Sequence, residues 1–152
     1  MDAADGPAEH ARYAAHLADL ERVADTDEAG LVAGVLTDPD PVMARAAVVR
    51  HLDRRAAELC PEPVWEEWAE VMARVVTGHP FLVRRLEEWA LFRAVALRLP
   101  WHRDDLLAAS DWLQLKAADG TDPEALRLLA ESGRTKRIRN TARESLGRQA
   151  GG

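Results

Sequence analysis

The stretch EALRLLAESGRTKRIRNTARESL, residues 124–146, has the pattern of two short helices joined by a tight turn. Asp122 and Pro123 precede it and are typical of an N-cap and a first helical residue. Gly133 is typical of a residue that ends a helix, and apolar residues recur four apart after it. The stretch therefore predicts a helical hairpin. The inward-facing residues of its second helix are Ile138, Ala142 and Leu146.

Helical spacing continues through the rest of the chain. Start and stop residues separate about seven or eight segments, and no segment shows the sustained alternation of a strand. Alanine and leucine dominate the apolar residues, which also favours helix. We therefore predict an all-α fold. Its helices are expected at residues 7–24, 27–37, 41–59, 64–76, 81–99, 104–119 (one helix, or two that abut at Ser110), 124–132 and 134–146.

The apolar pattern also predicts which helix faces are buried. Residues 89–99 are apolar at nearly every angle around the helix axis, so we expect a central helix there, buried on more than one side. Two other helices carry a single apolar stripe each. In residues 41–59 the stripe is Val42, Ala46, Val49, Ala56 and Leu59; in residues 64–76 it is Trp68, Val71, Met72 and Val75.

The length of the chain is that of one globular domain. Its 152 residues can bury a core without disulfides or metals, so we predict a single domain over residues 1–152. Residues 1–6 and 150–152 are expected to fray. The formal net charge is −6. A bias toward alanine and arginine resembles the composition of proteins from high-GC bacterial genomes.

Several classes of function lack their usual motifs. Cys60 is the only cysteine, which excludes an internal disulfide and a cysteine-rich zinc site. The histidines lack the pair spacing of a metal site, and no glycine-rich phosphate loop or nucleophile motif is present. A secretory leader pattern and an uncharged apolar run of membrane-helix length are also missing. We expect a cytoplasmic protein that uses no cofactor, no metal and no membrane.

Two hairpins of the sequence share a pattern. Residues 138–146 run in the order apolar, Arg, two residues, Ala, three residues, Leu. The earlier LVAGVLTDPDPVMARAAVVRHL, residues 31–52, has a short apolar helix, a turn with Asp and Pro, and a helix with an arginine and the small Ala46. These features resemble HEAT repeats, a helical-hairpin family of the armadillo type. Ala46 and Ala142 would stand where neighbouring helices approach closely.

The resemblance covers residues 27–59 and 122–146, whereas residues 62–118 have hairpin character without the repeat's residues. Where the pattern places an arginine, beside Met43, this chain has Ala44, which leaves the register of the first repeat open. The resemblance implies a short right-handed α-α superhelix of stacked antiparallel hairpins. A plain helical bundle is the alternative.

Residues 133–149 form a basic run, with six basic residues against one acidic residue in a chain of negative net charge. The functional hypothesis is a ridge that binds phosphate or an acidic partner. The alternative is a solvated helix whose charges are favoured by the helix dipole and pair with acids of the preceding hairpin. The residues of the predicted ridge are Lys136, Arg137, Arg139, Asn140 and Arg143.

Aromatic residues and one arginine supply a second set of candidates. Trp68 and Trp89 fall on apolar faces and are expected in the core. Trp65, Trp101 and Trp112 are candidates for lining a groove, because they lie off the main stripes or beside loops. Arg93 interrupts an apolar helix and is expected either to pair with a carboxylate or to anchor a ligand.

Three hypotheses of function follow. The first is a non-catalytic scaffold that binds another protein or peptide on its helical-repeat surface. The second is nucleic-acid binding by the basic helix, although no aromatic residues are interleaved with its charges. The third is an enzyme, because Asp111 beside Trp112 in a HEAT-like array is similar to the DNA-alkylation-repair glycosylases, with Arg93 as a companion. No oligomeric state is predicted.

Overall fold

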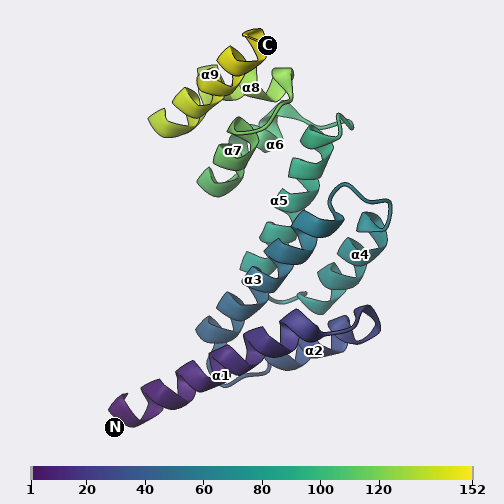
Figure 1. Cartoon of the computed structure of the whole chain (residues 1–152), viewed down its shortest axis with the longest axis vertical. Helices are drawn as coiled ribbons and strands as arrows, with labels where there is room; N and C mark the ends of the chain where they lie inside the picture. The colour runs from purple at the N-terminus through teal and green to yellow at the C-terminus, as the bar shows by residue number, and fades with distance from the viewer. Residues whose placement is uncertain (1, 152) are drawn as a thin grey trace. The chain divides into compact units, whose positions relative to one another are not determined.

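The computed structural model describes residues 2–151, with the side chains of residues 8–151, and it is built from helices (Figure 1). Within that range there are nine α-helices, one short 3-10 helix and no strand, which confirms the all-α prediction. The helices are α1 (Asp2–Arg22), η1 (Asp25–Asp27), α2 (Glu28–Val35), α3 (Pro41–Leu59), α4 (Trp65–Val75), α5 (Pro80–Ala96), α6 (Arg103–Ala108), α7 (Asp111–Ala118), α8 (Pro123–Ser132) and α9 (Lys136–Ala150).

Side-chain caps fix several of the helix starts. Each capping oxygen accepts a hydrogen bond from a backbone N–H inside the first turn, at 3.0 to 3.2 Å. Ser110 is one of them, and it divides the predicted segment 104–119 into α6 and α7. This division helps to bring the helix count to nine, above the seven or eight predicted. The capping residues are Asp40 for α3, Ser110 for α7, Asp122 for α8 and Thr135 for α9.

Two helix ends differ from prediction. α1 begins at Asp2, so Pro7 lies inside the helix and does not start it, and residues 2–6 are helical. α5 ends at Ala96 and not at Leu99, because Arg98 adopts a left-handed backbone with φ of 56°. The Leu99 N–H then donates to the Ala94 carbonyl at 2.8 Å, which closes the helix end. At the other terminus α9 includes Ala150.

The chain divides into two compact units, Met1–Leu86 and Glu87–Gly152, and the single domain over residues 1–152 stays a prediction. The boundary falls inside α5, the helix predicted as central. Trp89 and Val95 of that helix are buried, but Leu97 and Leu99 are each 40% exposed. Burial on more than one side is therefore wrong for the end of the segment, because the chain leaves the helix at Ala96.

The first unit packs α1 and α2 against α3, and α2 also against α4. The start of α5 is held to α3 by a bidentate ion pair, in which Arg85 donates to Asp53 at 2.9 and 3.0 Å. On α4, Trp68 and Met72 are buried as predicted, whereas Val71 and Val75 are half-buried.

The predicted stripe of α3 is displaced by about one position. Val42 is 65% exposed and Ala46 is also exposed, so Ala46 is not the close-contact residue of the hairpin. Apolar residues occupy adjacent positions along this helix, so spacing alone could not decide which of them meet α1 and α2. The buried apolar residues are Met43, Ala44, Ala47, Val48, Leu52 and Ala56.

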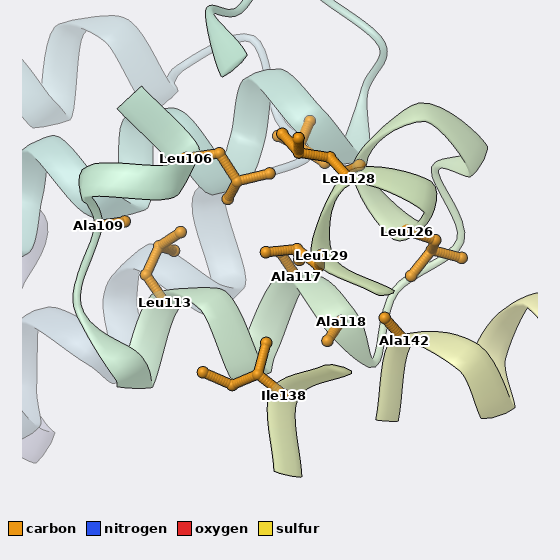
Figure 2. Close-up of a cluster of buried hydrophobic side chains, with 12 residues drawn as sticks. Leu106, Ala109, Leu113, Ala117, Ala118, Leu126, Leu128, Leu129, Ile138 and Ala142 are labelled. Atoms are coloured by element: carbon orange, nitrogen blue, oxygen red, sulfur yellow. The ribbon is translucent and has the colours of Figure 1, made fainter. Parts of the chain in front are cut away.

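The second unit has a core that α6, α7, α8 and α9 share (Figure 2). Leu113, Leu129 and Ile138 meet there, and Ala142 is fully buried as predicted. Gly133 ends α8 at a point of close approach: a Cβ on it would lie 2.6 Å from the Leu129 carbonyl oxygen and 2.7 Å from Ile138 Cγ2. The α8–α9 hairpin therefore needs a residue without a side chain at this position.

Candidate functional site

The outer face of α9 carries cations without an acidic partner among the described residues. Lys136, Asn140 and Arg143 are exposed, opposite the buried Ile138 and Ala142. Among the described residues, no carboxylate lies within ion-pair distance of Lys136, Arg137 or Arg143. Arg143 donates a hydrogen bond to the Asn140 side-chain oxygen at 3.0 Å, which is a neutral acceptor. We call Lys136, Arg137, Asn140 and Arg143 the basic ridge.

The other basic residues of the run stabilise the fold. Arg134 donates to Asp111 at 2.7 Å and to the carbonyl of Leu107, at the end of α6. Arg139 is half-buried, and its guanidinium donates to the Gly133 carbonyl at 2.8 Å. This contact helps to close the α8–α9 hairpin, and the binding role of Arg139 stays a prediction.

Two cations of the ridge stand at the electrostatically unfavourable end of their helix. Lys136 and Arg137 are the first two residues of α9, and no acidic residue lies in its first turn. The N-terminus of a helix carries a partial positive charge, which disfavours cations by about 0.3 to 1 kcal/mol each. The alternative that the dipole favours these charges is therefore wrong for Lys136 and Arg137.

An open groove runs between α7 and α9, and it brings together residues of both sequence-predicted sets. Trp112 enters it from α7, and Arg137 enters it from α9. Its volume is about 440 Å³, within the usual range of ligand sites of roughly 300 to 1,000 Å³. We call it the α7–α9 groove. Its lining residues are Trp112, Leu115, Lys116, Asp119, Arg137 and Thr141.

Lys116 is a cation of this groove that the sequence analysis missed. Its ammonium lies 4.8 Å from the ring centroid of Trp89 and 4.8 Å from that of Phe92, both on α5. Contacts of this kind hold a cation over aromatic faces. Trp112 packs edge-on against Trp89 at 5.6 Å, so the same aromatic group supports both residues. The sequence feature that could have identified Lys116 is its four-residue spacing from Trp112, which places both residues on one helix face.

The remaining candidate aromatic residues do not line this groove. Trp65 is 3% exposed and packs on Trp68 with ring centroids 5.5 Å apart, so it is a core residue. Trp101 is half-buried against the apolar core of the second unit. Arg93 is half-buried on α5 and is not a lining residue of the groove.

Asp111 is the first residue of α7, and its side chain is 62% exposed. Its carboxylate accepts the 2.7 Å hydrogen bond from Arg134 and does not line the α7–α9 groove. It thus ties the start of α7 to the turn before α9. The glycosylase hypothesis requires an aspartate directed into a cleft, and this carboxylate is engaged elsewhere.

A buried polar cluster in the first unit was not predicted. The Glu28 carboxylate, 3% exposed, accepts hydrogen bonds from His51 at 2.7 Å, from Arg55 at 3.0 and 3.2 Å, and from Trp68 at 3.1 Å. Burial disfavours its ionised form, but these hydrogen bonds and the Arg55 charge outweigh burial and lower the pKa of Glu28 to about 2. The cluster joins α2, α3 and α4.

Comparison with known protein families, curated proteins and solved structures finds no match to the chain. Over the described residues, no group of three or more His, Cys, Asp or Glu side chains is arranged to hold a metal ion. None of the helices in that range has both the length and the apolar content that crossing a bilayer requires.

Proposed function

We propose that the chain is a non-catalytic binding protein whose basic ridge and α7–α9 groove bind an acidic segment of another protein. HEAT-like stacking of its hairpins would suit this role, because such hairpins expose long ridges of side chains. The ridge supplies three exposed cations within eight residues of one helix.

One observation carries this proposal. Lys136 and Arg137 stand where the helix dipole disfavours them, and among the described side chains no carboxylate lies within ion-pair distance of either. Charges that stabilised the fold would be expected at the opposite end of α9, where Arg148 lies. Cations that cost the fold free energy are expected to be offset by a partner's negative charge.

An acidic protein segment is favoured over nucleic acid by the composition of the surface. The ridge is short, and two acidic residues accompany it: Glu144 follows Arg143 within α9, and Asp119, at the end of α7, lines the same groove as Arg137. No aromatic residue is interleaved with the cations of α9, whereas sites for single-stranded nucleic acid use stacked aromatics. Duplex binding depends on many phosphate contacts, and its affinity falls steeply with salt.

The test measures the affinity of the full chain for a fluorescent, glutamate-rich peptide by anisotropy. The triple variant Lys136→Gln, Arg137→Gln, Arg143→Gln is expected to lose affinity by about tenfold or more, or about 1.4 kcal/mol. The matched control is Arg50→Gln, Arg84→Gln, Arg103→Gln, which removes three exposed cations elsewhere and should bind like the wild type.

Two outcomes would contradict the proposal. If the two triple variants lose the same affinity, the peptide responds to overall charge and not to the ridge. If a DNA duplex at the same salt concentration binds far more tightly than the peptide, the partner is a nucleic acid.

A further inference from the structure

We propose that the α7–α9 groove selects one apolar or aromatic side chain of the acidic segment, while a neighbouring carboxylate of that segment binds Lys116 and Arg137. This inference rests on the proposed function, because it specifies what the ridge's partner must contain. It adds that a ligand with negative charge but no apolar side chain fills only part of this surface.

The apolar part of the groove requires more than an anion. Trp112 and Leu115 are half-buried lining residues, and both also pack against the core of the second unit. Burying apolar surface favours binding. An inorganic anion would leave the indole and leucine surfaces in water, whereas an apolar side chain would cover them.

The charged part of the groove is held in place before a ligand arrives. Lys116 is positioned by the rings of Trp89 and Phe92, each 4.8 Å from its ammonium. A cation fixed in this way loses little side-chain entropy when it binds a carboxylate. Arg137 enters from α9, so a carboxylate in the groove meets a cation from each helix.

Asp119 is the acidic lining residue, and it lies close to a cation outside the groove. Its carboxylate is 3.6 Å from the guanidinium of Arg148. Two cations and one paired carboxylate leave the groove with a net positive charge. That charge is complementary to an acidic segment and opposes binding of a basic one.

The required partner element is therefore an acidic peptide with an apolar anchor. Small anions satisfy only the charged half of the groove, and a neutral apolar peptide satisfies only the other half. A polyphosphate backbone presents no apolar side chain to Trp112 and Leu115.

The experiment compares the binding of two labelled peptides of equal charge to the full chain: a glutamate-rich peptide with a central phenylalanine, and the same peptide with serine there. We expect the phenylalanine peptide to bind about tenfold more tightly. Thr141→Phe, which fills the groove without changing a charge, should abolish this preference and leave the affinity for the serine peptide near the wild-type value. Far-UV circular dichroism checks that the variant is folded.

The two lysines of the chain give a matched second comparison that does not depend on the groove filler. Lys116→Met keeps the alkyl stem over the rings but removes the charge. It should therefore lower the affinity for the phenylalanine peptide more than the affinity for the serine peptide. Lys136 lies outside the groove lining, so Lys136→Met should lower the affinity for both peptides by the same factor.

The outcomes separate this inference from the proposed function. Three results would overturn the inference while binding at the ridge stands. They are equal affinity of the wild type for the two peptides, a preference that survives Thr141→Phe, or a Lys116→Met variant that loses no more affinity for the phenylalanine peptide than for the serine peptide. If neither peptide binds the wild type, both the inference and the proposed function are overturned.

Discussion

Nε2 of His51 lies 2.7 Å from a carboxylate oxygen of Glu28, and both side chains are almost completely buried. The other ring nitrogen, Nδ1, accepts a hydrogen bond from Arg54 at 3.2 Å, which leaves the proton on Nε2. His51 therefore donates a hydrogen bond to Glu28 through Nε2. This contact joins α2 to α3 and shows that the first unit has a polar centre.

Replacing the Glu28 carboxylate should destabilise the first unit. Glu28→Gln keeps the shape of the side chain but removes the charge that Arg55 faces at 3.0 Å. Arg55 keeps its ion pairs with Asp25 and Glu58, both at 3.2 Å, so the expected loss is that of the charge-assisted hydrogen bonds to Glu28, about 2 kcal/mol. Urea denaturation measures the loss, and an unchanged free energy of unfolding would contradict this account of the cluster.

The same carboxylate predicts acid sensitivity. The pKa of Glu28 is about 2 in the folded chain, against an ordinary value of 4.5, so the unfolded chain takes up the proton first as pH falls. The stabilisation is complete above pH 4.5 and is lost as pH falls through 2; it amounts to about 3 kcal/mol. Urea midpoints across this range should fall steeply in the wild type and less steeply in Glu28→Gln. Parallel profiles would show that another group controls acid unfolding.

The turn between α8 and α9 should not tolerate a side chain. In Gly133→Ala the new methyl group would meet the Leu129 carbonyl and Ile138, so we expect a loss of about 2 kcal/mol. Gly30→Ala in α2 is the control, because a methyl group there would meet nothing within 4 Å, and it should be neutral or slightly stabilising. Equal thermal shifts for the two variants would count against the close approach.

Charge reversal at the two ends of α9 should have opposite effects on stability. Lys136→Glu puts an anion at the first residue of the helix and should raise the free energy of unfolding by about 0.5 kcal/mol. Arg148→Glu puts an anion in the last turn, close to Asp119, and should lower it by a similar amount. A destabilised Lys136→Glu variant would remove the argument that this cation is kept for binding.

Local signals predicted the helices well. Asp40 with Pro41 and Asp122 with Pro123 start helices where the sequence indicates, because a cap depends on neighbours within one turn. The stripe of α3 was not predictable in the same way. Its apolar residues surround much of the axis, and contacts with α1 and α2 decide which of them are buried.

The site was predictable in part. Arg137 and Trp112 were each candidates, but only the packing of α7 on α9 brings them into one groove. Lys116 was missed because its aromatic partners lie on α5, more than twenty residues earlier in the chain. Glu28 was missed for the same reason. Its partners come from two other helices, and contacts between distant segments leave no local pattern in the sequence.

The most direct test of the central claim is a backbone amide NMR titration of the full chain with the phenylalanine-containing acidic peptide. We expect the largest shift changes in residues 112–119 and 136–143, with residues 28–75 almost unchanged. Shift changes concentrated in the first unit, or spread evenly over both units, would contradict binding at the basic ridge and the α7–α9 groove.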